Sequence, residues 1–202
     1  FSTSANPVQD IFFRNSIKSV LEIREFAEAN QCAVHHAGDF FNEGNIASPE
    51  LSVVIPLLKS FKEKGINIFL NLGNHDVEFI EKIPTSIESL ASVFVNIFPA
   101  RTQDPFTEYR FNEFRINLFP YRGEAKFNIA FEAFLNSEIK QPAILCLHED
   151  IKGVRMGKAV MKSGINEDRI CEMAKGKFVL IACGHMHHHY AGNKFGIPFL
   201  IP

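Results

Sequence analysis

Residues 66–76 have the sequence INIFLNLGNHD, an apolar run of strand length followed by four residues that are small or polar. A helix is predicted just before this run, over residues 48–64, because a proline fits its first turn, a lysine ends it and a glycine follows as C-cap. Pro56 in the middle of the helix predicts a kink or a break. Residues 32–37 form an earlier apolar run. Strand, helix and strand in this order predict a parallel crossover unit, and therefore an α/β chain.

The rest of the chain alternates in the same way. A helix is predicted from Asn6 to about Asn30, and a hairpin is predicted from the short runs 106–111 and 114–119. Later elements are expected over 124–136 (helix), 143–147 (strand) and 177–183 (strand). Residues 149–166 are expected to form a long excursion that carries Lys152, Arg155, Lys158 and Lys162. This cationic stretch is either a solvated loop or a contact for a phosphate backbone.

Composition limits the class of protein. A length of 202 residues fits one domain, residues 1–202, and 46% hydrophobic residues are too many for a disordered chain. A net charge of −2 excludes a uniformly basic nucleic-acid coat protein. No apolar run approaches the ~20 residues of a membrane helix. Four cysteines without a CxxC pair favour a reducing, cytoplasmic location. Because the chain begins with Phe1 and not Met, we expect it to be cut at both ends.

Four of the apolar runs end in a cluster of polar side chains. Seven residues make up these clusters: Asp39, Asn74, His75, Asp76, His148, His185 and His187. Ligands of open α/β sheets collect at the carboxyl ends of the strands, where loops from neighbouring strands converge. The seven side chains are therefore expected to face one pocket.

This set of side chains predicts a metal site. A ligand set of imidazole, carboxylate and amide oxygen is more suitable for Mn, Fe or Zn than a set of thiolates would be. A pair of divalent ions ~3.5–4 Å apart can clamp a phosphate and create a hydroxide nucleophile near neutral pH. In such a centre Asp39 is the candidate bridging carboxylate. His75 is the candidate acid that protonates the departing oxygen, and Asp76 is placed to orient its ring.

Each cluster alone also has a structural interpretation. Asp39 alone would fit a turn, and His148 alone would fit a hydrogen-bonded structural histidine. Residues 74–76 could form a helix cap or a tight turn, and the histidines from 185 onward could belong to a surface strand. Four such coincidences at four strand ends are much less probable than one shared site.

For other polar residues the structural interpretation comes first. His35 and His36 are predicted to be structural, and His188 and His189 to lie at the periphery of the site or on the surface. The pair Tyr121 and Arg122 either steers a phosphate or begins a turn.

At these residues the chain resembles the calcineurin-like metallophosphoesterases. The motifs Gly38-Asp39, Gly73-Asn74-His75-Asp76, an isolated His148 and Gly184-His185-Met186-His187 occur in the order of that family. The resemblance implies two packed mixed β-sheets flanked by helices, with a two-metal centre at the strand ends. It also implies that Asp39 bridges the metals, that Asn74, His148 and His185 hold one of them and that His187 helps to hold the other. His75 would be the catalytic histidine, supported by Asp76.

One part of the family pattern is absent from the sequence. The opening strand of the family carries an Asp-x-His that completes the metal site of His187, and no Asp-x-His occurs in these 202 residues. We therefore expect the N-terminal strand to be missing, with the chain starting just after it.

Within the family, softer similarities point to the Mre11 and SbcD nuclease subunits. They lie in residues 37–42, 57–76, 119–121 and 147–153. This likeness implies manganese-dependent exonuclease or endonuclease action on DNA in repair or recombination, a homodimer and a Rad50/SbcC-type ATPase partner. Two alternatives stay open: a phosphodiesterase or phosphatase of small nucleotides, and a catalytically silent interaction module.

Overall fold

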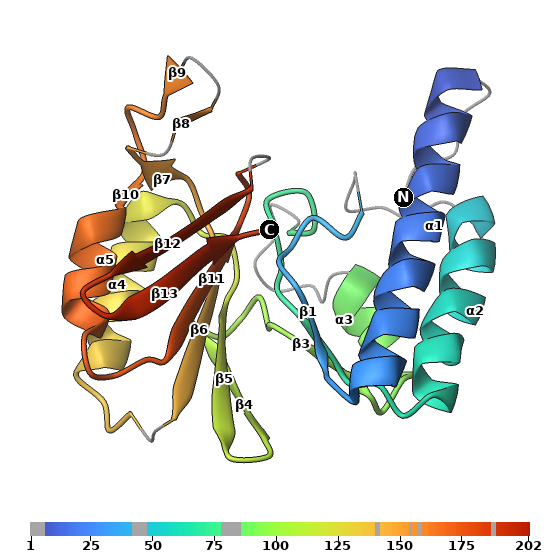
Figure 1. Ribbon diagram of the computed structural model, residues 1–202, viewed down its shortest axis with the longest axis horizontal. Coiled ribbons are helices and arrows are strands. Elements are labelled where there is room, and N and C mark those ends of the chain that lie inside the picture. Colours follow the sequence, from blue (N-terminus) through green and yellow to red (C-terminus); the bar gives the residue numbers. More distant parts are fainter. Residues whose placement is uncertain are drawn as a thin grey trace.

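The smaller of the two main sheets contains the predicted crossover unit. The computed structural model describes residues 7–41, 48–77, 86–139, 142–153, 155–156, 159–186 and 189–202. Strands β1 (Val34–His36), β2 (Ile68–Leu70) and β3 (Ile97–Pro99) pair in that order, all parallel. Helices α1 (Pro7–Asn30) and α2 (Ser48–Glu63) stand beside this sheet, and α3 (Ser86–Ala91) precedes β3 (Figure 1). The strand–helix–strand prediction is confirmed.

The larger sheet is mixed and has the strand order β12-β13-β11-β6-β5-β4. Its strands are β4 (Thr107–Phe111), β5 (Phe114–Phe119), β6 (Ala143–His148), β11 (Leu180–Gly184), β12 (Tyr190–Lys194) and β13 (Ile197–Ile201). The central strand β6 runs parallel to both β5 and β11, whereas each edge is closed by an antiparallel hairpin. Together with α4 (Glu124–Leu135) and α5 (Glu167–Ala174), this confirms the predicted α/β class with packed sheets flanked by helices.

Alternation along β5 and β6 produces a separate core on each face of the larger sheet. Successive strand residues point to opposite faces. Leu118 and Cys146 therefore pack towards the smaller sheet, in one cluster with residues of β2 and α2. Their neighbours Phe119 and Leu145 pack on the other face with α4 and α5. The larger sheet is thus buried on both faces, which fixes where the ends of β6 and β11 lie.

Phenylalanine fills much of both cores. Phe119 is fully buried, with its ring centroid 5.4–5.9 Å from those of Phe106, Phe127, Phe131 and Phe134. These distances are typical of stacked and edge-to-face aromatic pairs. The 21 Phe of the sequence are therefore largely explained by packing.

Several elements differ from the sequence predictions. Helix α2 runs through Pro56 without a break, and Pro56 lies on its exposed face, where a missing backbone hydrogen bond costs less than in a packed interior. The stretch 149–166 is not one long loop: it contains β7 (Ile151–Lys152) paired with β10 (Ile165–Asn166), and the hairpin of β8 (Arg155–Met156) and β9 (Ala159–Val160). Among the described helices, none has the length and apolar character that a membrane crossing requires.

Candidate metal centre

Asp39 lies in a tight turn just after β1. Its backbone has φ 54°, in the left-handed region that non-glycine residues seldom occupy, so the surrounding contacts must hold the turn. The amide of Gly38 donates to His36 Nδ1 at 3.3 Å, and the amide of His75 donates to Asp39 Oδ1 at 3.0 Å. His36 therefore shapes the turn, in keeping with its predicted structural role. The other carboxylate oxygen of Asp39 faces the larger sheet.

Asp76 joins this turn to the loop after β2. Its carboxylate is buried and accepts hydrogen bonds from the amides of Gly73 (3.0 Å), Phe40 (3.1 Å) and Phe41 (3.1 Å). These bonds fix Asn74 and His75 relative to Asp39. The hydrogen bonds described for Asp76 thus hold the backbone of these loops. Its expected role in orienting the exposed His75 ring stays a prediction.

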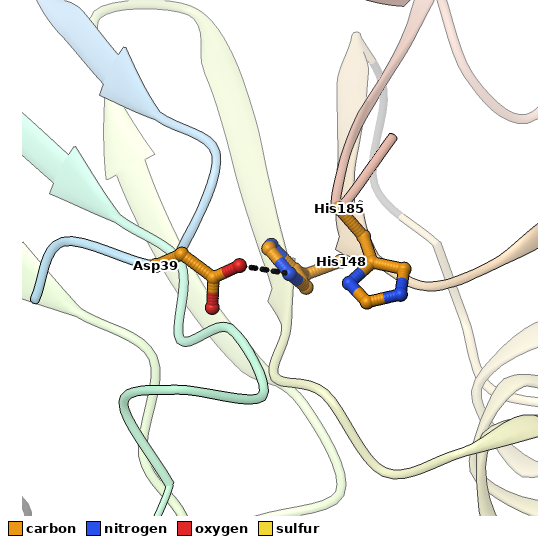
Figure 2. Close-up of side chains that lie close together, drawn as sticks. All are labelled: Asp39, His148 and His185. Carbon is orange, nitrogen blue, oxygen red and sulfur yellow. Dashed lines mark ion pairs between the residues drawn. The ribbon is translucent and has the colours of Figure 1, made fainter. Parts of the chain in front are cut away.

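The larger sheet contributes two imidazoles. His148 ends β6, and His185 directly follows Gly184, which lies opposite His148 in the β11–β6 register. His148 Nε2 lies 3.2 Å from Asp39 Oδ2 and 3.3 Å from Asn74 Oδ1, and His185 Nδ1 lies 2.9 Å from the same Asn74 oxygen. Figure 2 shows Asp39 approaching from one side and the two histidines from the other. Ligand atoms of Asp39, His148 and His185 lie within 4.8 Å of one another.

The donor set fits a divalent cation. His148 Nδ1 is 2.7 Å from the carbonyl oxygen of Ala37, so it carries the ring proton and leaves a lone pair on Nε2. That lone pair faces the oxygens of Asp39 and Asn74, which are themselves acceptors. Several electron pairs pointed at one place repel each other unless a proton or a cation lies between them. Carboxylate, amide oxygen and imidazole are suitable ligands for Mn, Fe or Zn.

The electrostatics of the centre favour the protonation states that bind metal. Burial alone would raise the pKa of Asp39, but the neighbouring His148 and His75 and the donating amide of His75 bring that pKa below its ordinary value. Burial lowers the pKa of His185, against the opposing effect of Asp150. An ionised carboxylate and a neutral imidazole are the forms that coordinate cations.

Close backbone approach explains two of the motif glycines. A Cβ on Gly73 would collide with the Asp39 carboxylate. A Cβ on Gly184 would collide with the carbonyl of Ala37 and with the His148 ring. At these two positions the metal-binding loops touch, so a side chain would force the sheets apart.

The structure places most of the predicted site residues in this centre. Asp39, Asn74, His148 and His185 meet, and His75 is tied to Asp39 through its amide. His187 lies outside the described residues, as do His188 and Lys158 of the cationic stretch. His189 is exposed next to β12.

Three further side chains lie at the site: Tyr121, for which the sequence left two interpretations, and Glu149 and Asp150, which were not predicted as site residues. The ring of Tyr121 lies 5.8 Å from that of His185 and 6.3 Å from that of His148. Asp150 Oδ1 lies 3.1 Å from His185 Nε2. Burial raises the pKa of Glu149 to about 7, and this carboxyl accepts the amide of Arg122 at 2.9 Å. The sequence did place Glu149 and Asp150 directly after His148, within the similar stretch 147–153.

The contacts of Arg122 bear on whether this residue steers a phosphate or begins a turn. Its guanidinium donates to the carbonyls of Thr102 (2.9 Å) and Asp104, so it ties the turn before α4 to the loop after β3. A side chain with these bonds fixes a turn. The alternative in which Arg122 steers a phosphate is therefore not supported by the described contacts.

A comparison with protein families agrees with this centre. A sequence model of the calcineurin-like phosphoesterases matches residues 14–200. Among solved structures, the chain is similar to one described as a novel archaeal phosphodiesterase, with 14% identity, a TM-score of 0.45 and coverage of 94% of this chain and 78% of that one. The family match spans every residue that meets at the centre.

Proposed function

The chain belongs to the calcineurin-like phosphoesterase family, and we propose that it is a two-metal phosphodiester hydrolase that cuts DNA in the manner of the Mre11 and SbcD nucleases. The observation that carries the proposal is the convergence of lone pairs from His148, His185, Asp39 and Asn74 on one place. The choice of DNA rests on the similarity in residues 37–42, 57–76, 119–121 and 147–153. By the same similarity we propose a homodimer with a Rad50/SbcC-type ATPase partner, and from the cysteine usage we propose a cytoplasmic location.

Each residue of the centre has a proposed role. Asp39 would be shared by both ions, Asn74, His148 and His185 would hold one of them, and His187 would help to hold the other. Divalent ions, with Mn²⁺ as the proposed species, supply Lewis-acid activation of the phosphate and of water. His75, exposed beside the Asp39 carboxylate, would donate the proton that the departing oxygen needs.

The first experiment measures DNA cleavage with Mn²⁺. We expect the purified full-length protein to degrade duplex DNA, EDTA to stop the reaction and added Mn²⁺ to restore it. His75→Ala should lower kcat by about 10²–10⁴-fold, because that is the usual contribution of a general acid, with Mn²⁺ binding unchanged. His189→Ala removes another exposed histidine and serves as the matched control. Normal cleavage by His75→Ala would refute the proposed acid.

A second candidate keeps the chemistry and changes the substrate. The net charge of −2 suits a phosphodiesterase or phosphatase of small nucleotides as well as a nuclease. Parallel assays on mononucleotide diesters and duplex DNA separate the two, since a nuclease should leave the small diesters nearly untouched. Counting bound ions tests the silent interaction module, which should hold fewer than two per subunit.

A further inference from the structure

The imidazole of His185 lies between two oxygen atoms. Its Nδ1 faces Asn74 Oδ1 at 2.9 Å and its Nε2 faces Asp150 Oδ1 at 3.1 Å. We propose that Asp150 is a positioning residue that holds the proton of His185 on Nε2 and so keeps Nδ1 available as a ligand. The inference rests on the proposed metal centre, whose ligand set includes His185 but not Asp150.

The two histidines of the centre must carry their ring protons on different nitrogens. In His148 the Ala37 carbonyl holds the proton on Nδ1, so that Nε2 faces the centre. In His185 it is Nδ1 that faces Asn74, so the proton must stay on Nε2. A carboxylate is a strong acceptor for this purpose, and such partners orient metal-binding histidines in many proteins.

His185 also needs more support than His148. The side chain of His148 is 2% exposed and the residue belongs to a strand, whereas that of His185 is 22% exposed and its backbone has φ 77°. A ring on a strained turn at the surface of the centre is free to rotate unless its edges are held. Asp150 holds one edge, and the ring of Tyr121, tilted 33° to the imidazole, lies beside it.

The backbone of Asp150 is fixed well enough to act as this support. Its carbonyl accepts the amide of Ile165 at 2.8 Å, just before β7 pairs with β10. Gly164 packs so closely against Asp150 that a Cβ there would collide with the Asp150 carbonyl. The short parallel pair of β7 and β10 thus places the Asp150 carboxylate next to His185.

The proton position is measured directly by ¹⁵N–¹H NMR of the metal-free protein at pH 8, with His185→Gln to assign the signal. We expect the Nε2–H form of His185 in the wild type. In Asp150→Ala we expect a shift to the Nδ1–H form, which donates to Asn74 instead. A wild-type Nδ1–H form overturns the proposal. This reading needs no metal, so it tests Asp150 even if the proposed hydrolase activity fails.

Metal affinity provides the second measurement. Equilibrium dialysis with Mn²⁺ should show about 10–100-fold weaker binding for Asp150→Ala, the usual effect of losing such a partner. Asp150→Asn retains an acceptor oxygen and should restore most of the affinity, which a purely structural role would not predict. Asp104→Ala removes a carboxylate of similar exposure (39% against 37%) and should bind Mn²⁺ as the wild type does. Wild-type affinity in Asp150→Ala overturns the proposal.

Discussion

Oxygen ligands and imidazoles reach the candidate metal centre from different sheets and are held in different ways. Asp39 and Asn74 lie on loops after the short strands of the smaller sheet, and the buried carboxylate of Asp76 joins those loops. His148 is part of β6, and its neighbour β11 is paired with β6 over five consecutive residues, Leu180 to Gly184. The loops of the oxygen side thus share three backbone hydrogen bonds to one carboxylate, whereas His148 and Gly184 of the imidazole side belong to a ladder of backbone bonds.

This contrast shows where single substitutions should matter most. A ladder loses little when one side chain changes, because each backbone bond is independent of side-chain identity. Removal of the Asp76 carboxylate takes three hydrogen bonds from the loops at once. The oxygen side should therefore be the more fragile side of the centre, although it contributes the charged ligand.

Asp76→Ala should have the largest effect on stability. It leaves the amides of Gly73, Phe40 and Phe41 without their acceptor, and each buried unsatisfied donor costs about 1–3 kcal/mol. We expect a loss of about 4 kcal/mol in the free energy of unfolding, measured by urea denaturation, together with weaker Mn²⁺ binding.

Two further variants sharpen this test. Asp76→Asn keeps one acceptor oxygen and should lose less stability than Asp76→Ala. Asp104→Ala removes a half-exposed carboxylate whose ion pair with Arg101 spans 3.9 Å, and it should change stability by less than about 0.5 kcal/mol. If Asp76→Ala were as stable as Asp104→Ala, the carboxylate would not be what joins the loops.

His35 should make the smaller sheet sensitive to acid. Burial lowers the pKa of His35 from 6.5 to about 4, and its Nε2 is enclosed without a partner among the described residues. Between pH 6.5 and about pH 4, His35 therefore binds a proton in the unfolded chain but not in the folded chain. Stability is complete above about pH 6.5 and falls by at most about 3 kcal/mol as the pH drops to about 4.

The check on His35 is a pair of stability curves. His35→Phe cannot bind the proton, so its free energy of unfolding should fall less than that of the wild type between pH 7 and pH 4. Subtracting the two curves removes the contribution of other groups, including His36, whose pKa burial also lowers to about 4. Parallel curves would contradict a neutral His35 imidazole with an enclosed Nε2.

The same contrast explains which parts of the fold could be predicted from the sequence. The crossover unit and the β4–β5 hairpin were predictable because apolar runs and turn residues mark their bounds locally. The elements that were missed, β3 and α3 among them, are only 3 and 6 residues long, too short for a clear period. Residues 167–174, although strongly amphipathic as α5, were missed because they follow the irregular stretch 149–166.

For the site, the ligands could be predicted, and Asp76 was named among the site residues, but the contacts that hold the ligands could not be predicted. Asp39, Asn74, His148 and His185 are of residue types that bind metals, and they stand at strand ends, where such side chains converge. The proton position of His148 depends on the carbonyl of Ala37, 111 residues away, and a backbone carbonyl leaves no trace in a sequence. Support for the ligands arises from sheet packing, which local patterns do not encode.

Gly184→Ala tests the contact between the two sides and should have the smallest of the three effects. The added methyl group meets the Ala37 carbonyl of the oxygen side and the His148 ring of the imidazole side, neither of which can move without shifting a strand. Overpacking of this kind costs about 2 kcal/mol, which urea denaturation should detect, and Mn²⁺ binding should weaken with it. Ala182→Ser adds one atom elsewhere in β11, at a half-buried position, and should leave Mn²⁺ binding unchanged. If Gly184→Ala matched the wild type in both measurements, the two sides would not be in close contact, and the lone pairs of His148 and Asp39 would have room to avoid each other without a cation.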